Sequence, residues 1–543
     1  MKLSLTASLA LVATINAMPL NTLWQQFFNT NEDITLVGAD DSSVQAMSLH
    51  DTHRPSFDHV IDETEYNSLP EIDTDELQSL IGKKGLKKRA KELYKIAKSS
   101  VQEYGHPTRV IGSPGHWKTI KYVISELKKL NGYYTVYTQR FNAIDGKVKS
   151  FSLLIDGVQP KSLAALGLTP PTPNGKPVHG NLVLVEDFGC SLEDFPAFTK
   201  DNIVLIKRGE CPFGDKSVNA GVSGAKGAII YDDADGPLHG TLGTPTGKEV
   251  ATVSVSKKDV DEYIQKLLEN PRHEFETSLY VDSYIRNIST LNVIAETVFG
   301  DHDNVVALGA HSDSVAEGPG INDDGSGTIS LLEVAKHLTN FKVNNAVRFA
   351  WWAAEEEGLL GSNYYADNLS PKQNSKVRLF MDYDMMASPN FEYEVYDANN
   401  EDHPKGSGDL KQLYIDWYES QGLNYTLIPF DGRSDYVGFI ENGIPAGGIA
   451  TGAEGVKDDK SKEKFGGDVG KWFDPCYHQL CDDLSNPSYR AWVTNTKLIA
   501  HSVAVYAKSL EDFPEREVSS ENDVTVESRK KSGFIYRGSR LIM

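Results

Sequence analysis

Two stretches decide the fold of this 543-residue chain: residues 304–313, NVVALGAHSD, and residues 346–357, AVRFAWWAAEEE. Each begins with an apolar run of strand length and ends in histidine or acidic side chains. A run that is apolar throughout, rather than at every second position, is typical of a strand buried on both faces of its sheet. Ligands bind beyond the carboxyl ends of such strands, so the polar residues there are the first candidates for a functional site.

The same pattern recurs around these two stretches. It predicts an α/β fold, with a mixed, mostly parallel sheet flanked by helices. Further strands are expected at 376–383 and 444–451, and helices at 87–104, 116–130, 327–338, 362–368 and 409–421.

Between residues 149 and 284 the sequence pattern changes to short runs of β-forming residues separated by Gly/Pro turns. This predicts a small, mostly β module inserted into a discontinuous main domain, residues 83–148 and 285–512. A C-terminal tail, 513–543, shows no periodicity.

The N-terminal region has the pattern of a secreted protein. Residues 1–17 form an apolar segment with a small residue at its end, typical of a signal peptide. Residues 18–82 are predicted to be an acidic pro-segment: from Met18 to Leu80 there are 13 acidic residues against the single Arg54, and a lysine-rich stretch follows. The alternative is a solvated acidic tail. We expect the secretory pathway, with a vacuolar (lysosome-like) or extracellular destination and no membrane anchor, because no other apolar run is long enough to span a bilayer.

The amino-acid composition indicates a globular protein and limits the kinds of partner that it can bind. The chain has 40% hydrophobic and 24% charged residues, which are globular values. Its 54 Lys+Arg against 76 Asp+Glu give a net charge of −22, which argues against nucleic acid as a partner. No pattern indicates an oligomeric state.

The four cysteines allow three pairings. Proximity favours Cys190–Cys211 and Cys476–Cys481 over a zinc ribbon, because the first pair is too widely spaced for that motif. Three sequons, at Asn287, Asn368 and Asn424, predict glycosylation. Pro371 closely follows the second sequon and counts against glycosylation at Asn368.

Carboxylates and imidazoles follow successive predicted strands. Like charges on one rim repel unless cations lie among them, and a mixture of imidazole and carboxylate is typical of zinc. One carboxylate shared by two ions would give a two-metal site. The residues concerned are His311, Asp313, Asp323, Asp324, Glu355, Glu356, Glu357, Asp382, Asp384 and His478.

The chain also carries a resemblance to a known family. The strings GAHSDS (309–314), GINDDGSG (320–327), AEEEGLLGS (354–362), YDM (383–385) and CYHQLC (476–481) occur in the order seen in the two-zinc aminopeptidase family. In the inserted module, NIVLIKRG (202–209) and CPF (211–213) resemble a protease-associated domain, which in relatives is thought to shape substrate access.

The resemblance implies two divalent metal ions, most simply zinc, with cobalt or manganese as alternatives. Asp323 would bridge both ions, His311 and Asp384 would complete one position, and Glu356 and His478 the other.

The resemblance also implies roles around the metals. Glu355 would be the general base, and the Tyr477 hydroxyl would hold the oxyanion. Arg433 and Met385 would line the substrate pocket, and Asp313 would orient the first histidine. Close relatives often have His where this chain has Tyr436, a difference that bears on specificity.

The implied function is a metal-dependent aminopeptidase that acts on peptides with a free N-terminus. Three alternatives stand beside it: a carboxypeptidase of the glutamate carboxypeptidase type, a glutaminyl cyclase-like enzyme, and a non-catalytic receptor-like scaffold. A carboxypeptidase would need a cluster of cations for the substrate carboxylate, and the motifs contain none. A scaffold would lack metal ligands, and no ligand is missing here.

Overall fold

A computed structural model describes residues 60–232, 238, 240–243 and 245–516. They all belong to one compact unit, residues 57–543. The predicted signal peptide and the acidic stretch up to residue 59 lie outside the described residues.

The sheet has the predicted mixed α/β topology. Its strand order is β12-β11-β13-β10-β8-β9-β7-β3-β4-β5-β6-β2, and β1 pairs with β7. The neighbours β13, β10, β8 and β9 are parallel, so their carboxyl ends meet at one edge. These four are the strands that the sequence predicts, within one or two residues at most ends: β8 (Asp301–His311), β9 (Asn345–Trp352), β10 (Val377–Tyr383) and β13 (Ala446–Ala450), beside β11 (Glu394–Tyr396) and β12 (Thr426–Ile428).

Both faces of these strands are buried, as the continuous apolar runs require. Alternate residues of β9 point to opposite faces: Trp351 packs into the larger core, and Trp352 packs among aromatic rings on the other side. On that second face Phe380 and Phe439 stack with ring centroids 3.7 Å apart. The larger core is covered by α4 (Lys83–Ala97), α6 (Pro114–Lys128), α9 (Gly325–Leu338), α12 (Ser407–Ser420) and α15 (Tyr489–Lys508), and the other face by α10 (Leu360–Asp367), α11 (Pro371–Lys376) and α13 (Val437–Glu441).

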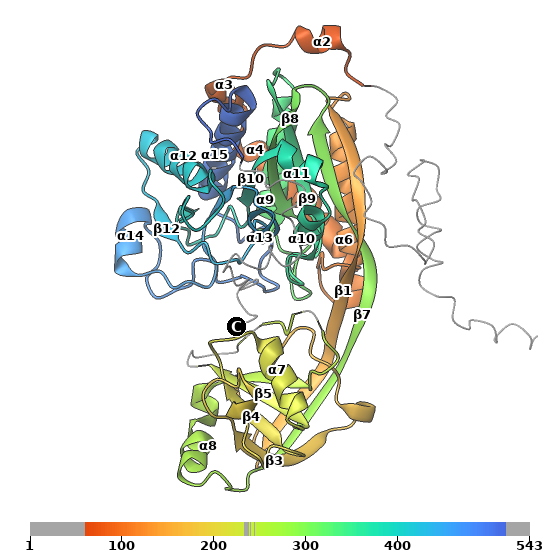
Figure 1. Cartoon of the computed structure of the whole chain (residues 1–543), viewed down its shortest axis with the longest axis vertical. Helices are drawn as coiled ribbons and strands as arrows, with labels where there is room; N and C mark the ends of the chain where they lie inside the picture. The colour runs from red at the N-terminus through yellow and green to blue at the C-terminus, as the bar shows by residue number, and fades with distance from the viewer. Residues whose placement is uncertain (1–59, 233–237, 239, 244, 517–543) are drawn as a thin grey trace, which may run out of the picture. The chain divides into compact units, whose positions relative to one another are not determined.

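The inserted module is continuous with the main sheet. β1 (Tyr134–Ile155) and β7 (Glu276–Thr297) pair antiparallel along almost their whole length and form one ribbon (Figure 1). β7 pairs with β9 near its end and with β3 near its start. The predicted boundaries at 148/149 and 284/285 therefore fall within β1 and β7, the first of them at a shift in the pairing register between Val148 and Ser150. The module contains β2 (Ala164–Ala165), β3 (Val178–Leu184), β4 (Ile203–Lys207), α7 (Phe213–Val222), β5 (Gly227–Asp232), β6 (Thr252–Ser256) and α8 (Lys257–Glu269).

Residues before Gly82 contribute to the core, which the sequence analysis did not anticipate. Two short helices, α2 (Glu63–Asn67) and α3 (Thr74–Ser79), bury Tyr66 and Leu77 in the larger core. The Tyr66 hydroxyl donates to the Val343 carbonyl at 2.9 Å. The sequence gives little sign of these two helices, because they are too short to show a periodic apolar face.

The chain end shows a similar difference. Phe513, assigned to the tail, is buried in the larger core, and Arg516 donates a hydrogen bond to the Val377 carbonyl at 2.6 Å. The rest of the predicted tail, 517–543, lies outside the described residues. Among the described residues, no helix is both long and apolar enough to cross a membrane.

Candidate metal centre

Five predicted ligands meet at the carboxyl edge of the sheet, each from a different segment. His311 ends β8, and Asp323 lies just before α9. Glu356 follows β9, Asp384 follows β10, and His478 lies in the loop before α15. The topology brings these residues together because the three strands are parallel neighbours.

The carboxylate of Asp323 is central to the group. Its Oδ1 lies 3.2 Å from His311 Nε2, and its Oδ2 lies 3.1 Å from His478 Nε2. Asp384 Oδ1 is 3.6 Å from the first imidazole, and Glu356 Oε2 is 3.1 Å from the second. One carboxylate thus faces two separate imidazole–carboxylate pairs, which is the arrangement expected of a bridging ligand.

The unsatisfied atoms of this group fit a metal. Among the described residues, both ring nitrogens of His311, Glu356 Oε1 and Asp384 Oδ1 are buried without a hydrogen-bond partner. Buried polar atoms are rarely left so, because each costs free energy. Nitrogen and carboxylate oxygen are ligands that suit Zn²⁺ and related ions, so the residues fit a divalent metal centre.

Electrostatics in the metal-free protein point the same way. Burial lowers the pKa of His311, but the carboxylates of Glu355 and Asp384 outweigh burial and hold it well above its usual value. Burial also opposes the charged form of His478, yet Glu356 and Asp323 raise its pKa to about 10. The imidazoles are therefore protonated without metal, and a bound cation must displace those protons.

Asp313 departs from its expected role of orienting the first histidine. Its Oδ1 lies 3.8 Å from His311 Nδ1, too long for a hydrogen bond. Its carboxylate instead accepts from the main-chain N–H groups of Glu355 at 3.4 Å and Glu356 at 3.3 Å. Asp313 therefore holds the strand end that carries the expected base and a ligand.

A cavity of about 330 Å³ opens beside the predicted metal ligands. Glu355 and Tyr477, the expected base and oxyanion donor, both line it. Glu355 is 3% exposed, with its Oε2 3.8 Å from His311 Nε2. The Tyr477 ring stacks on His478 at 3.7 Å between centroids, and burial, followed by the carboxylate of Asp323, raises its pKa well above the usual value. The phenol therefore remains a hydrogen-bond donor.

Arg433 and Met385 line the same cavity, as expected. The guanidinium of Arg433 is already engaged, because it donates two hydrogen bonds to the carboxylate of Asp431, one of them at 2.7 Å from Nε. The sequence analysis missed several wall residues on β11, at and after β12, at the end of β13 and in the loop before His478. No short motif marks them, and only the fold brings them to the cavity: Glu394, Tyr396, Ile428, Pro429, Ala450, Glu454 and Phe473.

Both predicted disulfides are present, Cys190–Cys211 and Cys476–Cys481. The second brackets Tyr477 and His478 and is flanked by two buried carboxylates. Asp482 accepts from the main-chain N–H of Asp323 at 3.0 Å, and Asp474 accepts from that of Cys476 at 2.9 Å. The loop of His478 is thereby tied to the segment of Asp323.

The three sequons differ in exposure. Asn287 and Asn424 are exposed, and Asn368 is partly buried with its side-chain amide donating to the Tyr364 carbonyl at 2.8 Å. Glycosylation stays a prediction at all three.

Comparison with known proteins agrees with this geometry. Residues 292–503 match the profile of Peptidase family M28, and residues 178–263 match that of the PA domain. The chain is 52% identical to Aminopeptidase Y of Saccharomyces cerevisiae over 517 residues, covering 93% of this chain and 91% of the relative. It is 40% identical to Leucine aminopeptidase 2 of Trichophyton rubrum over 468 residues, covering 86% and 92%.

Two solved structures are similar over most of their length. The aminopeptidase of Aneurinibacillus sp. strain AM-1 aligns with a TM-score of 0.66 at 25% identity, covering 82% of this chain and 98% of that one. A zinc aminopeptidase of Bacillus subtilis aligns with a TM-score of 0.56 at 26% identity, covering 78% and 96%. Identity above half across nearly the whole chain, together with the assembled ligand group, shows that this chain belongs to peptidase family M28.

Proposed function

We propose that this chain is a metal-dependent aminopeptidase that hydrolyses the first peptide bond of its substrates at a centre of two divalent ions, most simply zinc. The observation that carries the proposal is the Asp323 carboxylate, with one oxygen 3.2 Å from His311 Nε2 and the other 3.1 Å from His478 Nε2. The names of the relatives, aminopeptidases in each case, support the same activity.

The chain's own residues divide the work of hydrolysis. Divalent ions held by His311, Asp323, Glu356, Asp384 and His478 would make a bound water more acidic. Glu355, buried at the cavity wall, accepts the proton of that water and then returns it to the departing amine. Tyr477 donates its hydroxyl to the carbonyl oxygen as negative charge develops there.

The charge of the cavity favours the amino end of a peptide. Beside the proposed metal ligands, three further carboxylates line it, those of Glu355, Glu394 and Glu454, and among the described lining residues Arg433 is the only Arg or Lys. Because that guanidinium is paired with Asp431, it is poorly placed to bind a substrate carboxylate. A free ammonium suits such a cavity, whereas a carboxypeptidase substrate does not.

The proposal also covers the localisation and the processing of the protein. The N-terminal pattern and the two disulfides support the secretory pathway, with a vacuolar or extracellular destination. We take the removable acidic pro-segment to end before Ile61, because residues from there onward pack into the core. N-terminal sequencing of the native protein tests this, and a start at Met18 on fully active material would argue against removal.

The activity is tested with a panel of aminoacyl anilides and peptides, each free or N-acetylated, with and without chelator. We expect turnover only of free N-termini, loss of turnover on chelation, and recovery on addition of Zn²⁺ or Co²⁺. Comparable rates on acetylated and free peptides would point to an endopeptidase or a carboxypeptidase.

A further inference from the structure

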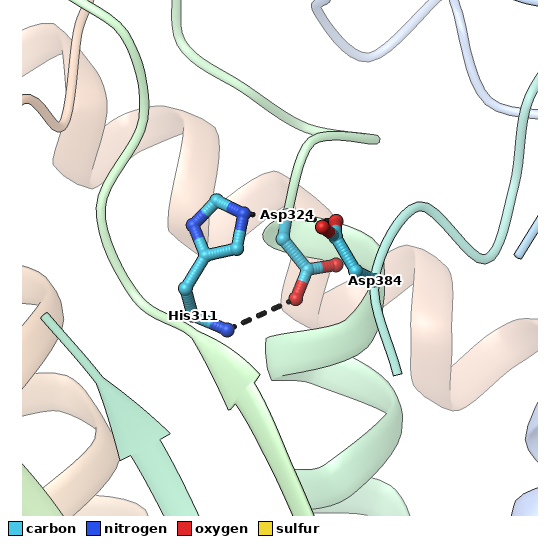
Figure 2. Close-up of side chains that lie close together, drawn as sticks. All are labelled: His311, Asp324 and Asp384. Atoms are coloured by element: carbon cyan, nitrogen blue, oxygen red, sulfur yellow. Dashed lines mark hydrogen bonds and ion pairs between the residues drawn. The ribbon is translucent and has the colours of Figure 1, made fainter. Parts of the chain in front are cut away.

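Asp324, next to the bridging carboxylate, is a completely buried side chain that accepts three main-chain hydrogen bonds. Its Oδ2 accepts from the N–H of His311 at 3.1 Å (Figure 2). Its Oδ1 accepts from the N–H groups of Gly327 at 2.7 Å and Met385 at 3.2 Å. Both oxygens of this one side chain thus accept main-chain N–H groups, so it links its three donors.

The three donors come from three different segments of the metal centre. His311 is itself a ligand, and Met385 directly follows the ligand Asp384. Gly327 lies in the first turn of α9, just after Asp323. One carboxylate therefore sets the positions of the backbones that carry His311 and Asp384 relative to each other.

Gly327 leaves room for this arrangement. A Cβ at that position would lie 2.0 Å from the Tyr383 carbonyl oxygen and 2.5 Å from each carboxylate oxygen of Asp324. Contacts under 3 Å would force one of these groups to move. The missing side chain thus lets α9, the end of β10 and the carboxylate pack together.

Proximity alone would also allow Asp324 to be a ligand, since its ligating atom lies within 4.8 Å of those of His311 and Asp384. However, each of its oxygens already accepts an N–H group, whereas Asp323 places an oxygen 3.2 Å from His311 Nε2. We propose that Asp324 is a positioning residue for the metal position formed by His311 and Asp384. The proposal rests on the metal centre proposed above.

The other metal position is held by different groups. Asp313 accepts from the main-chain N–H of Glu356, and Asp474 accepts from that of Cys476, two residues before His478. Among the described residues, no hydrogen bond of Asp324 reaches either ligand. Removing its carboxylate should therefore weaken the two positions unequally.

Asp482 offers a matched control. It is also a buried carboxylate that accepts main-chain N–H groups, those of Asn322 and Asp323, but it contacts neither His311 nor the segment of Asp384. D482N should therefore not single out the His311/Asp384 position.

The test is metal binding to the full chain after chelation, followed by calorimetry and metal analysis with Zn²⁺ and Co²⁺. We expect D324N to bind one ion about as tightly as the wild type and the other about 10–100-fold more weakly, the usual effect of losing a group that supports a ligand. Adding D384N to D324N should weaken further only the position that D324N has already weakened, whereas adding E356Q should weaken the other ion as well. At saturating Co²⁺ the visible absorption of D324N should match that of the wild type.

A second variant covers the case in which D324N does not fold. D324E keeps the carboxylate but displaces it by one methylene group, and the same selective weakening is expected. Equal weakening of both positions, with a matching fall in the thermal stability of the metal-free protein, would make Asp324 an ordinary structural residue. Unchanged affinities would overturn the proposal, and altered Co²⁺ absorption at saturation would make Asp324 a ligand. A wild type that binds no divalent ion would overturn the metal centre itself.

Discussion

Glu355→Gln separates the chemistry of this site from its scaffold. The side chain is 3% exposed, and its main-chain N–H is held by Asp313 at 3.4 Å. Glutamine has the same shape, so the cavity wall and the neighbouring ligands should keep their positions. What the variant loses is the ability to accept a proton from water.

The expected magnitude follows from that single loss. A positioned general base contributes about 10²–10⁴ to the rate. At about 1.4 kcal/mol for each factor of ten, this raises the barrier by about 3–5 kcal/mol. The substrate should still bind, so the fall should be in kcat with little change in KM, and metal content should be that of the wild type.

The assay is steady-state turnover of a free aminoacyl anilide, with metal content measured on the same sample. Glu356→Gln should instead lose metal together with activity. Glu357→Gln is the matched control. Glu355 and Glu356 are among the described residues that line the cavity, whereas Glu357 is not, so this variant should change turnover and metal content least. If the Glu355 variant loses metal while the Glu356 variant keeps it, the two assignments are exchanged. If neither variant slows hydrolysis, the reasoning is refuted.

Three further predictions concern the loop of His478, the N-terminal helices and the response to acid. Replacing Cys476 and Cys481 with Ser should weaken metal retention, because the loop that carries His478 loses its closure; unchanged affinity would show that the disulfide is incidental. Leu77→Ala should destabilise the protein by about 2–5 kcal/mol in urea unfolding. Leu80 is 40% exposed, so Leu80→Ala should cost no more than about 0.5 kcal/mol. Equal effects of the two substitutions would show that α3 does not pack into the core. Burial raises the pKa of Glu333, but the nearby His337 and the hydrogen-bonded Arg89 outweigh burial and lower the pKa from 4.5 to about 2. The stability contributed by this group is therefore complete above about pH 4.5 and is lost as the pH falls toward 2. When the free energy of unfolding is measured from pH 6 to pH 3, Glu333→Gln should reduce its dependence on pH. An unchanged pH dependence would contradict the lowered pKa of Glu333.

The main sheet was predictable because its strands are buried on both faces. β9 and β10 are buried along their whole length and β8 is buried from Val305 onward, and ionisable residues end or closely follow each strand, so pattern and function coincide in the same short strings. The ligand set follows from those strings together with the resemblance to a family, and the topology brings His311, Asp323 and Glu356 within 4.8 Å.

Other features depend on long-range packing and leave little trace in the sequence. α2 and α3 bury single residues such as Tyr66 and Leu77 within acidic surroundings, so they look like part of a tail. β1 and β7 continue through the expected module boundaries, because pairing with each other satisfies their backbones on both sides of the boundary. The cavity wall at Glu394 is similar: only the pairing of β11 with β13 brings it near the site.

The most direct test of the account is the number of metal ions that restore activity. Chelated protein is titrated with Zn²⁺ while turnover of a free aminoacyl anilide and bound metal are measured together. The account predicts two ions per chain at full activity, and fewer than two in the Glu356→Gln and Asp384→Asn variants. Full activity of the metal-free protein, or wild-type metal binding in both variants, would contradict it.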